Sequence, residues 1–570
     1  MDYTYLGKLH SREELRALDA EACKTLCGEI RQELVERVTQ NGGHLASNLG
    51  VVELTLALHR VFDLPEERVI FDVGHQSYVH KLLSDRFDRF DTLRKPGGIS
   101  GFQRRDESPY DAFGGGHAST SLSAALGFAE AEKLNGGKRF TVAVVGDGAF
   151  TGGMIHEAFN NCSEDLPLII VLNENEMSIS KNTGRFARII GKLRSTKGYF
   201  WMKRKVKKVL SVTKLGRRMV RNVSRLKMRI KRAMYADNYF EQIGINYLGP
   251  IDGHNLKKLE TVLREAKQDG GCSLIHVRTV KGKGYPEAEE DPGKFHGVPP
   301  AEHESVPTFS QHFGEKLTEM AKEDRRICAI TAAMADGTGL VRFGEEYPDR
   351  FFDVGIAEEH AMTFAAALSA AGMKPVYAVY ATFAQRCFDQ MIHDAALQRI
   401  PVTMAIDRAG LAVADGPTHH GVYDVSMAFS LPESEIFAPL TFDALDEFLE
   451  NAIDSDKMTF IRYRSGGECK RIGELPYIYK EGSLRGALSD EPDGLILTYG
   501  ALSEEALRAK DEAEKEGKAV SVIAIEKLRP DDETLKKILA IDDPFKTFEK
   551  DKTPYETHGI SFGDMLKALR

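Results

Sequence analysis

Cysteine is scarce in this chain, and long uncharged apolar runs are absent. The seven cysteines are an odd number and are scattered, except that Cys23 and Cys27 lie one helical turn apart. Because no disulfide framework or metal-ligand spacing emerges, we expect buried or incidental thiols. No apolar run reaches the roughly eighteen residues of a membrane span, and residues 1–10 lack the apolar stretch of a signal peptide. These absences favour a cytoplasmic protein without a transmembrane segment.

Acidic residues outnumber basic ones, but one segment reverses the balance. The chain has 85 Asp and Glu against 76 Lys and Arg, whereas residues 185–232 hold nineteen Lys or Arg and no acid. Apolar residues recur there at three-to-four spacing, so the segment can form basic amphipathic helices. We expect a mobile lid over an anionic site, with adhesion to anionic lipid or nucleic acid as the alternative. We expect no nucleic acid as the functional partner.

Two polar triplets follow short apolar runs and predict a metal site. Gly146-Asp147-Gly148 follows residues 141–145, and Asn173-Glu174-Asn175 follows residues 168–172. Such runs, separated by a helical stretch, indicate a βαβ unit with parallel and often neighbouring strands. Side chains at the carboxyl ends of neighbouring strands, about 4.8 Å apart, can share a ligand. Oxygen donors beside glycines suit Mg2+ holding phosphates, whereas a lone Gly-Asp-Gly is more often a plain turn. The second triplet favours the metal site.

Apolar runs and turn residues predict three α/β domains, over residues 1–306, 307–480 and 481–570. Helices are expected at residues 11–40, 51–62, 120–134, 357–371 and 383–398. Strands are expected at residues 68–71, 141–145, 168–172, 273–278, 327–332, 351–354, 375–380, 401–406, 494–499, 519–525 and 544–549. The Pro- and Glu-rich residues 286–307 are interpreted as a linker. Two successive nucleotide-type domains fit a cofactor held between them.

Six further motifs occur in an order that is typical of one enzyme family. Together with the two triplets, they resemble the 1-deoxy-D-xylulose-5-phosphate synthase family from about residue 5 to about residue 530, and the resemblance implies three doubly wound parallel-sheet domains of the transketolase-like kind. The motifs are Gly43-His44-Leu45-Ala46-Ser47, Asp72-Val73-Gly74-His75-Gln76, Gly116-His117-Ala118-Ser119-Thr120-Ser121, Tyr247-Leu248-Gly249-Pro250-Ile251-Asp252-Gly253-His254, Ile356-Ala357-Glu358-Glu359-His360 and Asp407-Arg408-Ala409-Gly410.

The resemblance also implies a reaction. It implies a homodimeric transferase that uses thiamine diphosphate and Mg2+ to join pyruvate to D-glyceraldehyde 3-phosphate, giving 1-deoxy-D-xylulose 5-phosphate and CO2. This is the first step of non-mevalonate isoprenoid precursor synthesis and also feeds thiamine and pyridoxal synthesis. The alternatives are a transketolase-like ketol transfer on another phosphosugar, which releases no CO2, and a degenerate cofactor-binding homologue.

Residues for the cofactor follow from the same resemblance. Glu358 is expected to touch the aminopyrimidine ring, although a carboxylate there could merely favour a helix N-terminus. Phe383 is expected to stack on that ring, with an ordinary core phenylalanine as the alternative. Asp147, Asn175 and the backbone carbonyl of Met177 are expected to hold the metal. The other expected cofactor contacts are His75, Gly116, His117, Ala118, Gly148, Ala149, Lys281 and Tyr285.

Residues for the substrates complete the expected site. Histidines suit proton transfer near neutral pH, and by resemblance the reacting centre is lined by His44, His75, His296 and His419. Arg408 is expected to hold the phosphate of the acceptor, with Tyr380, Asp415 and His419 near its hydroxyl and aldehyde groups.

One departure from the family pattern concerns the acceptor. Where the family has Arg-Tyr-Pro-Arg-Gly, with its last arginine as a second phosphate ligand, this chain has Arg462-Tyr463-Arg464-Ser465-Gly466. Arg464 is the candidate replacement, although adjacent strand residues face opposite ways.

Overall fold

The computed structural model describes residues 3–175, 240, 244–300, 306–412, 415–490 and 492–541. The chain forms two compact units: Met1–Ser434 with Leu449–Gly467, and Glu435–Phe448 with Glu468–Arg570. The predicted basic segment 185–232, the predicted metal ligand Met177 and the predicted strand 544–549 lie outside the described residues. Within the described part, no helix is both long and apolar enough to cross a membrane.

The first unit begins with helices whose starts are capped by side chains. Ser11 accepts a hydrogen bond from the backbone N–H of Glu14, and Asp19 accepts one from Ala22. The helix predicted at residues 11–40 is therefore two helices, because Asp19 starts a second one. The helices before and beside the first sheet are α1 (Arg12–Ala17), α2 (Ala20–Asn41), α3 (Leu45–Leu49), α4 (Val52–Val61) and α5 (Tyr78–Leu82).

A five-stranded parallel sheet follows, in the order β1-β2-β3-β5-β4. Its strands are β1 (Arg68–Phe71), β2 (Thr141–Gly146), β3 (Leu168–Glu174), β4 (Asn246–Asp252) and β5 (Ser273–Arg278). The helices α6 (Ser121–Leu134), α7 (Gly153–Asn160), α12 (Leu256–Asp269) and α13 (Pro286–Glu290) complete this part. Four of the strands were predicted, whereas β4 was known only as a sequence motif.

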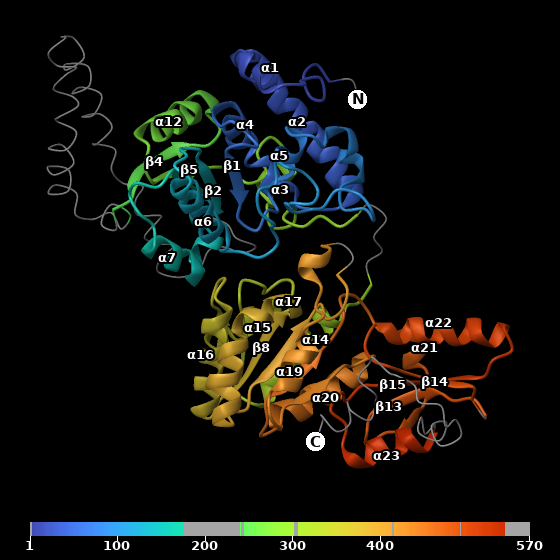
Figure 1. Ribbon diagram of the computed structural model, residues 1–570. Helices are drawn as coiled ribbons and strands as arrows, with labels where there is room; N and C mark the ends of the chain where they lie inside the picture. The colour runs from blue at the N-terminus through green and yellow to red at the C-terminus, as the bar shows by residue number, and fades with distance from the viewer. Residues whose placement is uncertain are drawn as a thin grey trace, which may run out of the picture. The chain divides into compact units, whose positions relative to one another are not determined.

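Helices cover both faces of this sheet, which explains why its central strands β2 and β3 are mostly apolar. Val142 and Val144 pack in the core that includes residues of α4 and α12. Ala143 and Val145, which point the other way, pack in the core that includes residues of α6 and α7. Figure 1 shows these two pairs of helices on opposite sides of the strands.

The pairing of β2 with β3 determines where the two polar triplets lie. Gly146 is the partner of Asn173 in the parallel register, and the backbone N–H of Asp147 donates to the Asn173 carbonyl at 3.1 Å. The triplets therefore leave adjacent strand ends, and this geometric prediction is confirmed.

The predicted linker is partly wrong. Residues 286–290 form α13, and Gly43 pairs with Val298 in an antiparallel bridge. The backbone N–H of Ala46 also donates to the Phe295 carbonyl at 2.9 Å. Residues 286–300 are thus held against the first motif loop by backbone hydrogen bonds, which composition alone does not reveal.

A second parallel sheet lies in the same unit, with strands in the order β11-β9-β8-β6-β7. These are β6 (Ile327–Thr331), β7 (Phe351–Asp353), β8 (Lys374–Tyr380), β9 (Thr403–Asp407) and β11 (Thr459–Arg462). Its helices are α14 (Phe309–Glu323), α15 (Val341–Glu346), α16 (Glu358–Ala370), α17 (Ala381–Ala384), α18 (Phe388–Gln390) and α19 (Asp424–Ser430). The single helix predicted at residues 383–398 is instead broken, and a π-helical turn occupies Met391–Ala395.

The second unit contains a smaller sheet in the order β12-β13-β15-β14. Its strands β14 (Gly494–Thr498) and β15 (Val520–Ile525) are parallel as predicted, but β12 (Tyr477–Tyr479) and β13 (Leu484–Ala487) pair antiparallel. The reason is the short connection between β12 and β13, which can join only antiparallel neighbours. The other elements are β10 (Glu435–Phe437), α21 (Lys470–Gly473), α22 (Leu502–Lys515), α23 (Asp532–Ile541) and α20 (Phe442–Asp454), which has residues in both units.

Candidate active site

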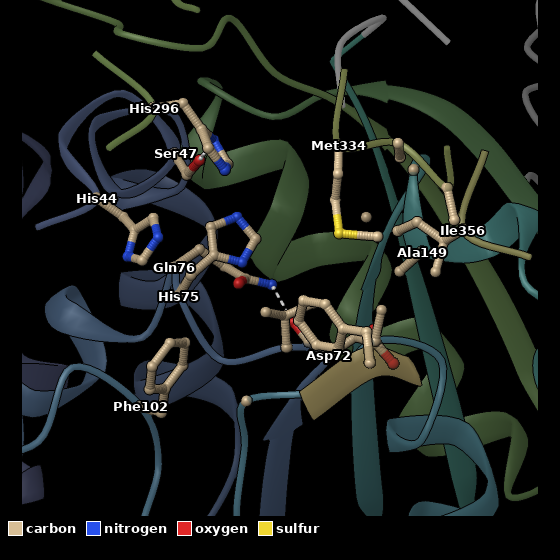
Figure 2. Close-up of a pocket in the computed structure, with 18 of the residues that line it drawn as sticks. His44, Ser47, Asp72, His75, Gln76, Phe102, Ala149, His296, Met334 and Ile356 are labelled. Atoms are coloured by element: carbon tan, nitrogen blue, oxygen red, sulfur yellow. Dashed lines mark hydrogen bonds between the residues drawn. The ribbon is translucent and has the colours of Figure 1, made fainter. Parts of the chain in front are cut away.

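A cavity of about 320 Å³ in the first unit gathers most of the predicted site residues. Residues from both parallel sheets line it, and Figure 2 shows the part around the histidines. The predicted residues in its lining are His44, His75, Gly116, Ala118, Asp147, Gly148, Ala149, Asn175, Lys281, His296, Glu358, Tyr380, Phe383, Arg408, Asp415 and His419. Met177 lies outside the described residues.

The ends of β2 and β3 place Asp147 and Asn175 together. The Asp147 side chain is buried, and its two oxygens accept backbone N–H groups from Gly148 at 3.1 Å and Asn175 at 3.2 Å. The neighbouring Asn173 accepts a hydrogen bond from the Thr279 hydroxyl at 2.8 Å. Within the described ranges no group of three His, Cys, Asp or Glu could bind a metal. The donor set of one carboxylate and one amide suits Mg2+, which takes its other oxygens from phosphates and water.

Lys281 adds a positive charge to this part of the cavity. It follows β5 and is buried, and burial lowers its pKa to about 8, while the charge of Asp147 opposes the shift. A bound diphosphate would favour the charged ammonium group and raise that pKa. Asp147, Asn175, Lys281 and Glu358 are called the cofactor group below.

A loop next to the cavity is held by Asp72, which the sequence motif contains but which had no predicted role. The buried Asp72 carboxylate accepts the backbone N–H groups of Ser119 and Ser121 at 2.7 and 3.1 Å, and the Ser121 hydroxyl at 2.6 Å. Ser119 has φ +69°, and Gly116 has φ +134°. A Cβ at Gly116 would also come within 2.6 Å of Thr418. Glycine is thus required for this close approach of the loop to Thr418.

His117, in the same loop, does not line the cavity but contacts residues that do. Its Nε2 lies 3.0 Å from both the Thr382 hydroxyl and the Thr418 carbonyl, and its ring packs edge-on against Phe383 at 4.9 Å. Burial lowers the pKa of His117. In this position it supports the Phe383 ring.

Glu358 is the first residue of α16, and its carboxyl is almost fully buried. Its Oε2 has no hydrogen-bond partner, and burial raises its pKa to about 7, against the opposing charge of Arg386. The nearest Arg386 nitrogen is 3.8 Å from that oxygen. A buried acceptor without a partner is costly unless a ligand satisfies it, so this atom fits a bound ring that carries nitrogen donors. Arg386 lines the cavity and was not predicted.

Three histidines from distant parts of the sequence form a triangle in the cavity. The ring centroids of His44, His75 and His296 are 5.3 to 5.4 Å apart, and Figure 2 shows the rings around a common space. The Nδ1 atoms of His44 and His75 have no hydrogen-bond partner. Burial is the main reason that the pKa of His75 falls to about 3 and that those of His44 and His296 fall well below their usual value. These imidazoles are therefore neutral at pH 7.

Two predicted acceptor residues, Tyr380 and Arg408, lie at the ends of β8 and β9, whereas Asp415 and His419 lie beyond the strands. The Arg408 guanidinium is 3.8 Å from the centre of the Tyr380 ring and donates to the Gly337 carbonyl at 2.8 Å. Asp415 pairs with Arg94 at 2.9 Å. His419 stacks on Phe102 at 5.1 Å, and burial lowers its pKa to about 4. Arg408, Asp415 and His419 are called the acceptor group below.

Two further predicted contacts, besides His117, do not line the cavity. Arg464 is half-buried, and its Nε donates to the Ser465 carbonyl at 3.3 Å, while the Ser465 side chain is exposed. Tyr285 packs edge-on against Phe295 at 5.6 Å. Their predicted contacts with substrate and cofactor remain predictions.

Comparison with known proteins places the chain in a class. The family model for 1-deoxy-D-xylulose-5-phosphate synthase matches residues 6–279, and the model for the transketolase pyrimidine binding domain matches residues 305–466. A transketolase structure from Campylobacter jejuni is similar over 92% of this chain and 91% of its own, with 17% identity and a TM-score of 0.37. The parallel sheets and the two matched domains define an enzyme of the transketolase-like class, which uses thiamine diphosphate with a divalent metal.

Two relatives with assigned names identify the family within this class. A 1-deoxy-D-xylulose-5-phosphate synthase of Clostridium kluyveri is 44% identical over 565 residues, which is 96% of this chain and 89% of its own. Another from Clostridium acetobutylicum is 43% identical over 541 residues, 93% of this chain and 87% of its own. The chain belongs to the 1-deoxy-D-xylulose-5-phosphate synthase family.

Proposed function

We propose that the cavity of the first unit is where this chain carries out the reaction of its family. The chain is a transferase that condenses pyruvate with D-glyceraldehyde 3-phosphate and gives 1-deoxy-D-xylulose 5-phosphate and CO2. This product is a precursor for isoprenoids. The observation that supports the site most directly is the buried Oε2 of Glu358, which has no hydrogen-bond partner and lies in the same cavity as Asp147 and Asn175.

The cofactor group binds the diphosphate and activates the ring. Asp147 and Asn175 would hold the metal against the diphosphate, and Lys281 would add its charge. When bound, thiamine diphosphate supplies the nucleophilic carbon and takes up the electron pair that remains after CO2 leaves. Glu358, whose pKa of about 7 lets it gain or lose a proton near neutrality, would hold or move a proton at Oε2 toward the ring of the cofactor. Phe383, held by His117, would pack against that ring.

The neutral histidines act on the pyruvate half of the reaction. Because His44 and His75 each have an Nδ1 without a partner, each can donate a hydrogen bond from an Nδ1–H to an oxygen of pyruvate. Their low pKa values prevent them from adding positive charge to the cavity, so the reacting carbonyl is oriented by hydrogen bonds. The apolar lining of Phe102, Ala332, Met334 and Ile356 excludes water from the bond that forms.

The acceptor group binds the aldehyde. The Arg408 guanidinium is fixed by its stacking on Tyr380 and by its bond to Gly337, so it can meet a phosphate with a planar pair of N–H donors. His419 would donate a hydrogen bond to the aldehyde oxygen and stabilise the negative charge that develops there as the carbon–carbon bond forms. Asp415, through Arg94, orients the loop that carries His419.

The proposal extends to assembly and location. The resemblance to the family supports a homodimer, which light scattering on the purified protein would test; a monomeric mass at micromolar concentration would contradict it. The seven cysteines are free thiols, which fits the reducing cytoplasm. Fractionation of the native cells would test the location, and recovery outside the cytoplasm would contradict it.

The activity is tested with the purified chain, Mg2+ and thiamine diphosphate. We expect CO2 release from labelled pyruvate together with formation of 1-deoxy-D-xylulose 5-phosphate, which requires glyceraldehyde 3-phosphate. A transketolase-like ketol transfer would give a new sugar phosphate from a ketose donor without CO2. Formation of a sugar phosphate without CO2 would contradict the proposed function. The absence of any reaction under conditions where a clostridial relative is active would also contradict it.

A further inference from the structure

Two cysteines far apart in the sequence have their sulfur atoms almost in contact. The Sγ atoms of Cys162 and Cys272 are 3.1 Å apart. Cys162 follows the end of α7, and Cys272 directly precedes β5. Cys272 is buried, whereas Cys162 is only half-buried and can meet a small reagent. No other cysteine pair in the described part of the chain makes such a contact.

Backbone packing brings these two segments together. The N–H of Cys272 donates to the Glu164 carbonyl at 3.0 Å. Gly271 lies so close to that carbonyl that a Cβ there would come within 2.4 Å of the oxygen. The proximity of the sulfur atoms is therefore imposed by the fold and does not depend on a flexible side chain. A disulfide needs about 2.05 Å between the sulfur atoms, so closing the gap requires about 1 Å of movement.

The chemical setting makes Cys162 the more reactive of the two. The contact between the two thiols lowers the pKa of Cys162, whereas the same contact, together with burial, raises the pKa of Cys272. Cys23 and Cys27, by contrast, lie in α2 and have pKa values raised by burial. The thiolate is the nucleophile in exchange with disulfides, so the half-buried Cys162 is the attacking sulfur.

We propose that Cys162 and Cys272 form an oxidisable dithiol, which a low-molecular-weight disulfide converts to an internal disulfide. The Cys162 thiolate attacks one sulfur of the reagent, forms a mixed disulfide and expels one thiolate. The Cys272 thiol then loses its proton and attacks Sγ of Cys162, forming the Cys162–Cys272 bond and expelling the second thiolate. Two protein thiols are oxidised, and one reagent disulfide is reduced to two thiols.

The dithiol lies at the edge of the first sheet opposite to the cofactor group. Cys272 precedes the first residue of β5, whereas Asp147 and Asn175 follow the last residues of parallel strands in the same sheet. A strand of six residues is roughly 20 Å long, so the sulfur atoms are remote from the reacting centre. We therefore expect oxidation to change kcat by less than about twofold. This inference does not depend on the proposed function.

The test exposes the full-length protein to oxidised glutathione, traps the remaining thiols with iodoacetamide and maps the peptides by mass spectrometry. In the wild type we expect a peptide joined through Cys162 and Cys272, with a mass lower by two hydrogens, that dithiothreitol separates. In Cys272→Ser we expect glutathione to remain on Cys162. In Cys162→Ser we expect Cys272 to stay alkylatable. Cys23→Ser is the matched control and should behave as the wild type.

The alternative outcomes are distinct. If the wild type carries glutathione on Cys162 and no cross-link forms, the second sulfur does not reach the first and the proposal fails. If both cysteines stay alkylatable at oxidant levels that modify a fully unfolded sample, the pair is not oxidisable in the native state and the proposal also fails. Circular dichroism of each variant confirms that the fold is retained before its thiols are compared.

Discussion

The cofactor group and the acceptor group line one cavity but are held in different ways. Asp147 and Asn175 follow strands whose register is fixed by a ladder of backbone hydrogen bonds. Arg408 also directly follows a strand, β9, but its guanidinium is held by stacking on Tyr380, whereas Asp415 lies on a loop and forms an ion pair with Arg94. Backbone register tolerates changes of nearby side chains, whereas a side-chain network can shift with one substitution. The family departure at Ser465 also concerns acceptor binding, and Ser465 lies beyond the end of β11.

The largest expected effect is the loss of a metal ligand. Asp147→Ala removes the only carboxylate predicted to hold Mg2+, so thiamine diphosphate binding should fall by about 100-fold or more, because outer-shell partners alone are worth 10- to 100-fold. Isothermal calorimetry with Mg2+ present measures the affinity. Asp165→Ala, which removes an exposed carboxylate paired with Lys133, is the control. Undiminished affinity in Asp147→Ala would refute the assignment.

A smaller effect is expected at the acceptor group. A charge-assisted arginine–phosphate contact contributes roughly 1.5 to 3 kcal/mol, so its loss weakens binding about ten- to a hundred-fold. Because Arg464 does not line the cavity, we expect Arg464→Ala to leave the KM for glyceraldehyde 3-phosphate nearly unchanged and Ser465→Arg to lower it. The KM for pyruvate should stay the same in both variants. If Arg464→Ala raises the acceptor KM instead, Arg464 has replaced the missing arginine.

A further effect concerns the dependence of stability on pH in the cofactor-free protein. The pKa of Glu358 is about 7 in the folded chain against an ordinary 4.5, so its carboxyl binds a proton more tightly when folded. Its contribution to stability is full below pH 4.5 and is lost as the pH rises through 7. At ~1.4 kcal/mol for each tenfold difference in proton affinity, the loss is on the order of 3 kcal/mol.

Glu358→Gln should remove this dependence, because the amide stays neutral. Its melting temperature should exceed that of the wild type by a few degrees at pH 8 and match it near pH 4.5. Glu359→Gln, which changes the adjacent exposed carboxylate, is the matched control. A difference between Glu358→Gln and the wild type that does not vary with pH would show that Glu358 is ionised in the folded chain.

The contrast between the cofactor group and the acceptor group also explains which parts of the fold and site could be predicted from the sequence. Alternation of apolar runs with helical stretches predicted β1, β2, β3 and β5, and the register of β2 and β3 then placed Asp147 beside Asn175. The role of Asp72 in holding the loop at Gly116 could not be predicted, because it depends on hydrogen bonds between distant segments. Arg386 likewise reaches Glu358 only through the tertiary fold.

Composition misled the interpretation in two places. Prolines and acids indicated a linker after residue 286, but backbone pairing of Gly43 with Val298 binds part of that stretch and brings His296 into the cavity. The C-terminal sheet was predicted as parallel from the helices between its strands; β14 and β15 are parallel, but β13, which was not predicted, is antiparallel to both β12 and β15. In both cases backbone pairing between segments outweighed the pattern of residue types.

The central claim is that Glu358 activates the cofactor ring through its buried Oε2. It is tested most directly by hydrogen–deuterium exchange at C2 of bound thiamine diphosphate, followed by NMR in the wild type, Glu358→Gln and the control Glu359→Gln. We expect Glu358→Gln to keep much of the cofactor affinity while exchange slows by about 100-fold or more, the usual range for a lost proton-transfer group, and Glu359→Gln to match the wild type. Exchange in Glu358→Gln at the wild-type rate, with the cofactor bound, would contradict the claim.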